Sequence, residues 1–488
     1  MIDKNTVVEF EPVIGLEVHA QLSTESKIFC ACRVEYGVPP NSRTCPVCLG
    51  LPGALPVLNK KAVEYAVMMI LAVGGEVNLH SEFARKNYFY PDLPKGYQIT
   101  QYERPIGTGG SVRIKADDGG EKAIAINRIH LEEDAGKLIH GAGDDKHSKV
   151  DLNRCGVPLI EIVSEPDMTT PREAYDYLKK LKQILQYLGI CTGDMEKGHF
   201  RCDANISIRK KGEKIGGIRT ELKNLNSFRF VEKALNYEIE RQTGLIKAGR
   251  PVEQATLMWN GRKQVAEQMR TKEEADDYRY FPEPDLPPCR VDRQTAADII
   301  LKLPELPDEK LERFVKEYKL SKYDAAILTE TRPLADCFET VMGNYDNSKA
   351  AANWMINDVL RVLHEVKLEV EDFTVPPKDV ADLLKLIDSG EISVKIAREV
   401  FSYMVDSGGA PADIVAQKGW LQITDSGELE KIVESVLAEE GENIQRYRDG
   451  QKELLGYFVG QVMKKTGGLA APESTNKIIR EKLDGLEG

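Results

Sequence analysis

Long apolar runs are missing from this sequence of 488 residues. No stretch approaches the ~18–20 consecutive apolar residues that a membrane-spanning helix needs. The first residues, MIDKNTVVEFEP, also lack the basic segment and the apolar segment of a secretory signal. These absences predict a cytoplasmic protein with no membrane anchor.

An excess of basic residues is missing as well. The chain has 66 Lys and Arg against 78 Asp and Glu, a formal net charge of −12. Indiscriminate binding to nucleic acid depends on basic side chains that neutralise phosphates, so this balance argues against it, and we expect no DNA partner. A local basic patch stays compatible with the balance, and surplus carboxylates suit a protein that holds divalent cations.

The usual nucleotide-binding signatures do not occur. There is no GxxxxGK[ST] loop, no dinucleotide glycine fingerprint and no protein-kinase signature set. Internal repeats and low-complexity tracts are absent too. If the chain binds ATP, we therefore expect it to do so on the face of a sheet.

Helical patterns replace mixed patterns about two thirds of the way along the chain. Strand-like alternation and helices mix over about the first 290 residues, and helical patterns dominate from Leu301 onward. Prolines crowd the junction between 282 and 307, and a glycine pair at 408–409 indicates a second hinge. We expect an α+β protein: a mixed α/β domain over 1–293, a helical domain over 294–406 and a helical tail over 407–488.

Capping signals locate several helices. Thr170 and Pro171 are typical of an N-cap and a first helical residue, and the apolar stripe that follows ends at Gly189. Another helix is predicted from Asn59 to Val73. In the C-terminal part, helices are expected near 308–318, 347–366, 378–388 and 474–484.

Four of the nine cysteines fall within nineteen positions: Cys30, Cys32, Cys45 and Cys48. Two closely spaced thiol pairs on tight turns can present four thiolates as a tetrahedron, the arrangement of structural zinc. Loop-forming residues such as Gly37 and Pro39 let the second pair fold back on the first. We predict a structural zinc knuckle at 30–48, with unligated or transiently oxidised thiols as the alternative.

Acidic residues occur within several predicted strands. The segment Ile14–Leu22 alternates between apolar and polar residues, which places Glu17 and His19 on one face, roughly 7 Å apart along the strand. They are close enough to share one ion, although a solvated outer face would show the same pattern. Residues 199–209 alternate in the same way, with Arg201 and Asp203 on the polar side.

Two further strands carry carboxylates where apolar residues are expected. Glu161 interrupts the run LIEIV, and a buried carboxylate costs several kcal/mol unless a cation or partner compensates it. Glu132 and Glu133 follow the strand-like AIAINRIHL, but the alternation does not decide which of them points inward. Acidic strand ends, a histidine and nearby basic residues together suggest a Mg–nucleotide site with oxygen ligands.

Several long motifs resemble those of one family, the B subunits of the Asp/Glu-tRNA amidotransferases. They are GLEVHAQL (15–22), RKNYFYPDLPKGYQITQY (85–102), HLEEDAGK (130–137), DLNRCGVPLIEIVSEPD (151–167), FRCDANIS (200–207), ELKNLNSF (221–228), DDYRYFPEPDLPP (276–288) and GYFVGQVMKKTGG (456–468). The resemblance covers essentially the whole chain in order. It implies a glutamine-synthetase-like sheet in the N-terminal cradle domain.

The resemblance also implies an activity and partners. We expect a cytoplasmic heterotrimer with an amidase-type A subunit, which releases ammonia from glutamine, and a small C subunit. The B subunit would use ATP and Mg²⁺ to phosphorylate the side-chain carboxylate of misacylated Glu-tRNA(Gln) or Asp-tRNA(Asn). Ammonia would then displace phosphate and form the amide, which fits the need to convert a carboxylate oxygen into a leaving group.

Residue roles carry over from the family motifs. The Mg²⁺ ligands implied by the resemblance are Glu17, His19, Glu133 and Glu161. Candidates for nucleotide or carboxylate contact are Arg201, Asp203, Lys223 and Asn224. Candidates for lining the ammonia path are Lys86, Tyr97 and Gln98.

The last 48 residues carry a slight basic bias, eight Lys and Arg against seven acidic residues. Such a bias usually marks a solvated helix surface, and the resemblance adds the expectation of tRNA binding by phosphate and shape contacts. The candidate tRNA contacts are Arg446, Arg448, Lys464 and Lys465.

Two other classes of protein stay open on the sequence. One is an ATP-dependent ligase that acts on a free small carboxylate and turns over ATP without tRNA. The other is a noncatalytic RNA-binding scaffold in which Glu17 and Glu161 are merely structural. The sequence also leaves open whether Gln-tRNA or Asn-tRNA is the product.

Overall fold

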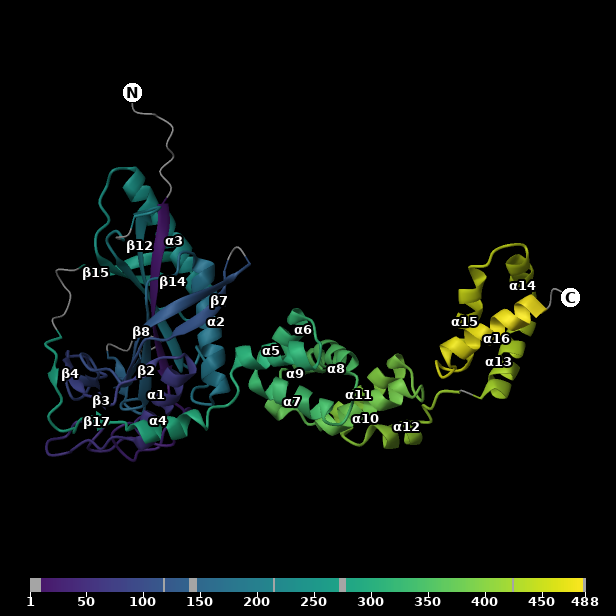
Figure 1. Cartoon of the computed structure of the whole chain (residues 1–488), viewed down its shortest axis with the longest axis horizontal. Coiled ribbons are helices and arrows are strands. Elements are labelled where there is room, and N and C mark those ends of the chain that lie inside the picture. Colours follow the sequence, from purple (N-terminus) through teal and green to yellow (C-terminus); the bar gives the residue numbers. More distant parts are fainter. Residues whose placement is uncertain are drawn as a thin grey trace, which may run out of the picture. The chain divides into compact units, whose positions relative to one another are not determined.

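The computed structural model describes residues 10–116, 119–139, 147–213, 216–271, 278–423 and 425–485. The chain divides into two compact units, residues 1–307 and 308–488. All named strands of the described residues lie in the first unit, and the second is helical (Figure 1). The predicted α+β class, with a sheet-rich N-terminal part and a helical C-terminal part, is confirmed.

A ten-stranded sheet forms the frame of the N-terminal unit. Its strands follow the order β15 (Val265–Thr271), β14 (Ala255–Asn260), β13 (Thr220–Lys223), β12 (Phe200–Lys210), β1 (Phe10–Gln21), β11 (Pro158–Ser164), β8 (Glu121–Glu133), β6 (Gly107–Thr108) and β2 (Glu76–Val77), with β7 (Ser111–Lys115) paired to β8. The four central strands β12, β1, β11 and β8 are antiparallel neighbours. β1 and β12 were predicted from alternation, β11 from a buried apolar run and β8 from a strand-like segment, and the structure confirms all four as strands.

Helices cover one face of this sheet. They are α1 (Lys60–Ala72), α2 (Pro171–Tyr187) and α3 (Phe228–Lys247), which contact β8, β7 and β12 respectively. The apolar residues of the alternating strands, such as Leu16, Ile160 and Ala204, are buried on this side with the apolar stripe of α2. Because side chains alternate along a strand, the polar residues of the same strands emerge on the opposite face.

Local signals explain where α2 begins. The Thr170 hydroxyl accepts a hydrogen bond from the Glu173 backbone N–H, and Pro171 occupies the first turn. The Glu173 carboxylate in turn accepts the Thr169 backbone N–H at 2.7 Å. Reciprocal bonds of this kind satisfy the free N–H groups at the start of a helix.

Short elements border the main sheet. They are β4 (Ala84–Asn87), β5 (Tyr97–Thr100) and β16 (Phe281–Pro282) in a three-stranded sheet, β3 (His80–Ser81) with β17 (Cys289–Arg290), and β9 (Lys137–Ile139) with β10 (Lys149–Asp151). The helix α4 (Arg293–Ile300) contacts α1, and Ile299 belongs to the N-terminal core. The expected domain boundary at 293/294 thus falls at the first residue of α4, within the N-terminal unit.

The C-terminal unit is a succession of helices. They are α5 (Pro307–Glu317), α6 (Lys322–Leu328), α7 (Arg332–Met342), α8 (Ser348–Trp354), the π-helical turn η2 (Met355–Val359), α9 (Leu360–Val366), the 3₁₀ turn η3 (Val370–Asp372), α10 (Pro377–Asp388), α11 (Val394–Ser407), α12 (Pro411–Lys418), α13 (Ser426–Glu439), α14 (Gly441–Arg448), α15 (Leu454–Lys465) and α16 (Pro472–Gly485). Two hydrophobic clusters hold them, one around Phe338 and Phe401 and the other around Val433 and Phe458. Across the described part of the chain, no helix is long and apolar enough to cross a membrane.

Candidate active site and metal centres

A cavity of about 590 Å³ lies on the polar face of the sheet. Its wall is almost entirely charged, polar or aromatic, and it includes side chains from β1, β8, β11, β12 and β13. The helices on the other face bury the apolar half of each strand. The same alternation that builds the core therefore builds this cavity.

Register places one row of residues across the four central strands. Arg201 pairs with His19, His19 with Glu161, and Glu161 with His130. The Nε2 atoms of His19 and His130 lie 3.3 and 3.2 Å from one Glu161 oxygen. A carboxylate that interrupts an apolar run is thus held between two imidazoles.

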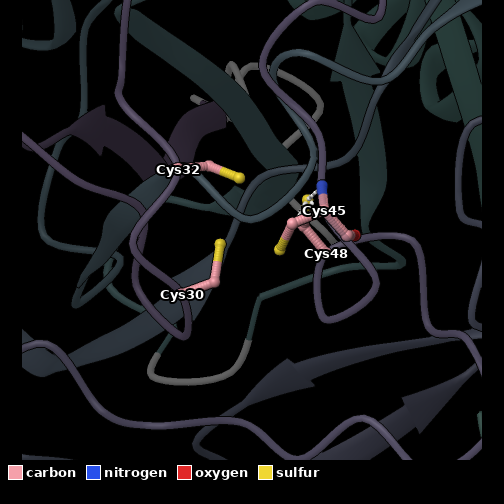
Figure 2. A group of neighbouring side chains, drawn as sticks. All are labelled: Cys30, Cys32, Cys45 and Cys48. Carbon is pink, nitrogen blue, oxygen red and sulfur yellow. Dashed lines mark hydrogen bonds between the residues drawn. The ribbon is translucent and has the colours of Figure 1, made fainter.

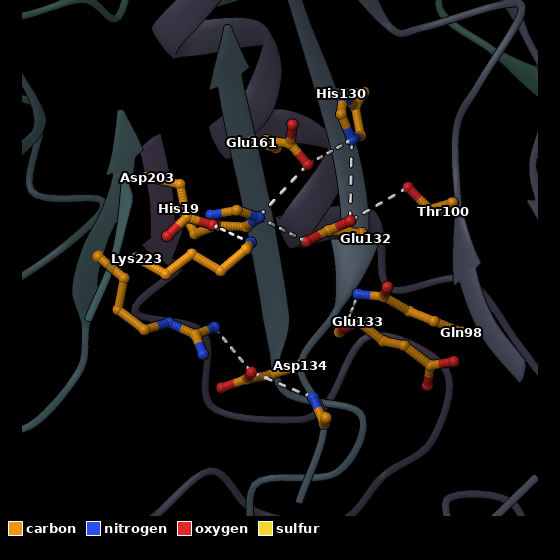
Figure 3. Close-up of polar contacts among 12 residues, drawn as sticks. His19, Gln98, Thr100, His130, Glu132, Glu133, Asp134, Glu161, Asp203 and Lys223 are labelled. Atoms are coloured by element: carbon orange, nitrogen blue, oxygen red, sulfur yellow. Dashed lines mark hydrogen bonds and ion pairs between the residues drawn. The ribbon is translucent and has the colours of Figure 1, made fainter. Parts of the chain in front are cut away.

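Glu132 completes a group of three potential cation ligands. One of its oxygens lies 3.4 Å from His19 Nε2, and the other accepts a hydrogen bond from the Thr100 hydroxyl at 3.2 Å (Figure 3). One ligand atom from each of His19, Glu132 and Glu161 lies within 4.8 Å of the other two. Two carboxylates and an imidazole suit a divalent cation, and only three protein donors leave positions for water and phosphate.

The ionisation of these groups follows from their proximity. Burial alone would lower the pKa of His130, but Glu161 and Glu132 outweigh it and raise the pKa to about 9. The pKa of His19 is also raised, because the negative charges of Glu161 and Glu132 outweigh the effect of burial. Burial works against ionisation of Glu161, yet the two histidines hold its pKa well below the ordinary value.

Glu133, expected among the metal ligands, lies elsewhere. Its neighbour Glu132 pairs with Leu159 and faces the cavity, whereas Glu133 pairs with Pro158 and faces the other side of the sheet. The Glu133 carboxylate forms a buried ion pair with Lys95 and accepts the Ile99 backbone N–H. In place of Glu133, the structure brings Glu132 to His19 and Glu161.

Glu17 lines the same cavity without joining the three-ligand group. Its carboxylate accepts a hydrogen bond from the Asn205 amide at 2.9 Å. Burial and the negative charge of Glu161 raise the pKa of Glu17. An additional cation close to this face would relieve both effects.

Basic side chains flank the carboxylates. Arg201 and Arg154 both bind Asp134, at 2.8 and 2.9 Å. Lys223 binds Asp203 at 2.7 Å. Arg201, Asp203 and Lys223, the predicted nucleotide or carboxylate contacts, all line the cavity.

The fourth predicted contact, Asn224, does not line this cavity. It has a left-handed backbone conformation with a φ of 64°. Its side-chain amide donates to the Trp259 carbonyl at 3.0 Å. Asn224 thus supports the turn that follows β13, next to Lys223.

The three residues assigned to an ammonia path are divided between two cavities. Lys86 and Gln98 line the main cavity, whereas Tyr97 lines a smaller one of about 210 Å³ together with Lys95 and Glu133. The Gln98 amide donates to the Glu133 backbone carbonyl at 2.7 Å. Gln98 therefore lies at the wall between the two cavities.

The four clustered cysteines belong to the segment that connects β1 with α1 in the sequence. Their side chains lie close together (Figure 2). Their sulfur atoms all lie within 4.8 Å of one another, and those of Cys45 and Cys48 are 3.9 Å apart. Tetrahedral zinc with bonds of about 2.3 Å requires sulfur atoms roughly 3.8 Å apart, so this donor set fits zinc. A hydrogen bond from Cys30 lowers the pKa of Cys48 to about 4, and Lys27, with its Nζ 3.6 Å from the sulfur, favours the same thiolate.

The four basic residues assigned to tRNA lie at the ends of two helices. Arg446 and Arg448 occupy the last turn of α14, and Lys464 and Lys465 the last turn of α15. All four are exposed. Tyr447, between the two arginines, is buried in the hydrophobic cluster of this part of the chain.

Alternation along single strands missed several residues of the main cavity. His130 and Arg128 share the cavity face of β8 with Glu132, and Tyr278 and Tyr280 reach it from a segment far along the sequence. The signal that identifies His130 and Arg128 is the register of β8 against β11, which places them on the same face as Glu132. The tyrosines stand in the motif DDYRYFPEPDLPP, but nothing local to that motif indicates which cavity they approach.

A profile of the family described as "GatB/GatE catalytic domain" matches residues 12–297, and one described as "GatB domain" matches residues 336–483. The chain belongs to the GatB family. The first match contains all the cavity-lining residues and the four cysteines. The second contains most of the C-terminal unit.

Relatives match over their whole length. The chain is 52% identical to the B subunit of the aspartyl/glutamyl-tRNA(Asn/Gln) amidotransferase of Carboxydothermus hydrogenoformans, over 97% of this chain and 99% of that protein. It is also 52% identical to the protein of the same name from Persephonella marina, over 98% and 100%. The protein of that name from Myxococcus xanthus is 50% identical, over 98% and 99%.

Proposed function

We propose that this protein is the B subunit of an ATP-dependent amidotransferase that acts on misacylated tRNA. Its substrates are Glu-tRNA(Gln), Asp-tRNA(Asn) or both, and its products are the corresponding Gln-tRNA and Asn-tRNA. Three observations support the proposal: membership in the GatB family, full-length similarity to proteins named as such B subunits, and a cavity whose donors fit a nucleotide-bound cation. The grouping of His19, Glu132 and Glu161 is the observation on which the chemistry rests.

The reaction proceeds in two steps. The side-chain carboxylate of the aminoacyl-tRNA attacks the γ-phosphorus of ATP, which forms an acyl phosphate and releases ADP. Ammonia then attacks the acyl carbon, the C–O bond to phosphate breaks, and an amide, inorganic phosphate and a proton result. Mg²⁺, when bound, offsets the negative charge of the phosphoryl group during transfer.

The residues of this chain hold the reacting groups in place. His19, Glu132 and Glu161 would hold Mg²⁺, with Glu17 beside them on the same strand face. Arg201 and Lys223, on the neighbouring strands, supply positive charge toward a phosphate or carboxylate. Substrate binding exchanges their present partners, Asp134 and Asp203, for groups that carry more negative charge.

The remaining parts of the assembly follow from the same proposal. An amidase-type A subunit supplies ammonia from glutamine, and with a small C subunit it completes a cytoplasmic heterotrimer. Lys86, Gln98 and Tyr97, which line the two cavities, form part of the ammonia path. Cys30, Cys32, Cys45 and Cys48 would hold zinc as a structural centre, and Arg446, Arg448, Lys464 and Lys465 contact tRNA.

The test is an amidation assay with the coexpressed subunits. Conversion of Glu-tRNA(Gln) and Asp-tRNA(Asn) is measured with ATP and glutamine each omitted in turn. We expect amide formation to require both. ATP hydrolysis that proceeds fully without tRNA would instead indicate a ligase for a free carboxylate.

Variants separate catalysis from scaffolding. Replacing Glu132 or Glu161 with Gln removes an anionic ligand, and we expect amide formation to fall by about 100-fold or more while tRNA binding is retained. The exposed Glu213 in the same unit provides the matched control, Glu213→Gln, with unchanged activity. Full activity in both cavity variants would contradict the catalytic assignment and favour a noncatalytic RNA-binding subunit.

A further inference from the structure

Two tyrosines on the cavity wall form a parallel stack. The rings of Tyr102 and Tyr280 have centroids 4.0 Å apart and planes only 5° apart. Both residues line the main cavity. Tyr102 is 45% exposed although one face of its ring is covered by Tyr280, so the stack has an accessible end.

The segment that carries Tyr280 is held firmly against the short sheet of β4 and β5. The Arg85 guanidinium binds the Glu283 carboxylate through two nitrogens, at 2.7 and 2.9 Å, and the Glu283 side chain is fully buried. The side-chain amide of Asn87 holds the segment at a second point, because it donates to the Arg279 carbonyl at 2.8 Å. The ring of Tyr280 is thus fixed before any ligand arrives.

Tyr280 also connects the stack with the carboxylate cluster. Burial raises the pKa of its phenol, and the negative charges of Glu161 and Glu132 raise it further. Tyr102, Tyr280, Glu132 and Glu161 all line this cavity, so the stack and the candidate metal ligands face the same space.

An unpaired hydrogen-bond donor belongs to a residue of the same cavity wall. Gln101 is 1% exposed and also lines the cavity. Its side-chain oxygen accepts the backbone N–H groups of Ile106 and Leu131, at 3.1 and 3.0 Å. Its amide nitrogen has no hydrogen-bond partner in the described part of the chain. A buried donor without a partner is costly, which points to a ligand that accepts from it.

The other aromatic rings of the wall are less accessible to a ligand. Tyr278 packs edge-on against Tyr88 and Tyr280, and the Lys86 ammonium lies 4.6 Å from its centroid. Tyr88 and Tyr278 are therefore only partly exposed. Among the aromatic residues of this cavity, Tyr102 is the one whose exposure leaves room for a further ring.

We propose that the Tyr102–Tyr280 stack is the platform for an adenine base, with Gln101 as a donor to a ring nitrogen of that base. This inference rests on the proposed function, because both substrates of the reaction carry adenosine. ATP brings one adenine, and the 3′-terminal nucleotide of tRNA, which bears the aminoacyl group, brings the other. Stacking on an aromatic ring suits any base, whereas the ring nitrogens of adenine accept the hydrogen bond that Gln101 has free.

The test compares Tyr102→Ala and Tyr102→Leu in the assembled complex. Leucine keeps apolar bulk but has no aromatic face, so both changes remove the stack. We expect the KM for the substrate whose adenosine binds there to rise about 5- to 100-fold, while kcat changes less than about threefold. The conservative Tyr102→Phe keeps the ring and should restore the KM.

Two titrations identify which adenosine is bound. An increase confined to the KM for ATP, measured at saturating aminoacyl-tRNA, assigns the platform to the nucleotide. An increase confined to the KM for aminoacyl-tRNA, measured at saturating ATP, assigns it to the tRNA end. Tyr323→Ala is the matched control because Tyr323 is an exposed tyrosine of the other unit, at 73% exposure.

The inference and the proposed function fail in different ways. If the unchanged complex forms amide but neither KM moves in the Ala and Leu variants, the platform is wrong and the proposed function stands. Equal losses in Tyr102→Phe and Tyr102→Ala would also overturn the platform, since the phenol and not the ring would then matter. If the unchanged complex forms no amide on tRNA, the proposed function itself fails.

Discussion

Buried charged residues in the N-terminal unit have specific partners. Glu161 lies between His19 and His130, and Glu133 forms an ion pair with Lys95. Removing one partner of such a pair leaves an uncompensated charge, which is far more costly than the pair is stabilising. These residues therefore couple the candidate site to the stability of the sheet that carries it.

A structural carboxylate outside the cavity provides a prediction of pH dependence. Burial would raise the pKa of Glu173, but the Lys122 ammonium and the Thr169 N–H outweigh it, so the pKa is lowered. A lowered pKa means that the stabilisation is fully present above the unfolded value of about 4.3 and is lost as the pH falls through the folded value. We expect Glu173→Gln to reduce the free energy of unfolding by about 1–2 kcal/mol at pH 7.

Urea unfolding at pH 7, 5 and 4 measures this effect. The difference between Glu173→Gln and the unchanged protein should shrink once the pH drops below about 4.3. Glu213→Gln, at an exposed position, serves as the control and should show little difference at any pH. A gap of constant size from pH 7 to pH 4 would show that the charge of Glu173 is not what stabilises the helix start.

Among the elements, β8 shows most clearly how a local irregularity decides the site. Before the bulge, Ile124 and Ile126 face the core; after it, Ile129 and Leu131 do. The pairing of β8 with β11 shifts between Val163 and Ser164, where one extra residue enters β8. An extra residue reverses the alternation, so Glu132 and not Glu133 faces the cavity.

The segment between β1 and α1 provides a prediction about zinc. Within residues 22–59, which lie in a fully described stretch, there is no helix and no named strand, and the four thiols bring the turns of this segment to one point. We expect about one zinc ion per purified chain. The variant Cys45→Ser should lose nearly all of that zinc, and its unfolding temperature should be lower because the metal stabilises this segment.

Elemental analysis and thermal unfolding check the zinc assignment. Cys337→Ser is the control, since Cys337 is a buried cysteine of α7 and distant in sequence from the cluster. It should retain the metal. Zinc content that is unchanged in Cys45→Ser, or absent from the unchanged protein, would contradict a four-thiolate centre.

On the scale of the whole molecule, the cavity and the exposed basic residues belong to different compact units. The hydrophobic cluster of the N-terminal unit shares no residue with the two clusters of the C-terminal unit. The cluster around Phe338 and Phe401 also includes Ile414 and Val415 of α12. A truncation at the predicted hinge near 407 would therefore damage the helical domain, and the cut belongs after α12.

We predict that removal of residues 425–488 weakens tRNA affinity at least about tenfold and leaves the N-terminal unit folded. The physical reason is the loss of phosphate contacts from Arg446, Arg448, Lys464 and Lys465, whose affinity also falls with salt. Replacing these four residues with Ala should reproduce most of the loss in equilibrium binding.

The control for non-specific effects of lost positive charge is the double variant Lys349→Ala and Lys395→Ala, because both lysines are exposed on other helices. Unchanged affinity in the truncated chain would rule out the tail as the tRNA contact.

The sequence by itself determined the elements and much of the chemistry. Period-two alternation located β1 and β12, and an apolar run interrupted by Glu161 located β11. Capping residues located α2, and cysteine spacing located the four-sulfur cluster, because each of these signals is local. Long motifs indicated the family. These local signals did not determine which residues share the site.

Only the tertiary structure decided the composition of the cavity. Cross-strand register placed His130 opposite Glu161, a bulge turned Glu132 inward, and the segment anchored by Arg85 brought Tyr280 onto Tyr102. These relations join residues separated by tens to hundreds of positions. They depend on pairing and packing between strands, which the alternation within one strand cannot encode.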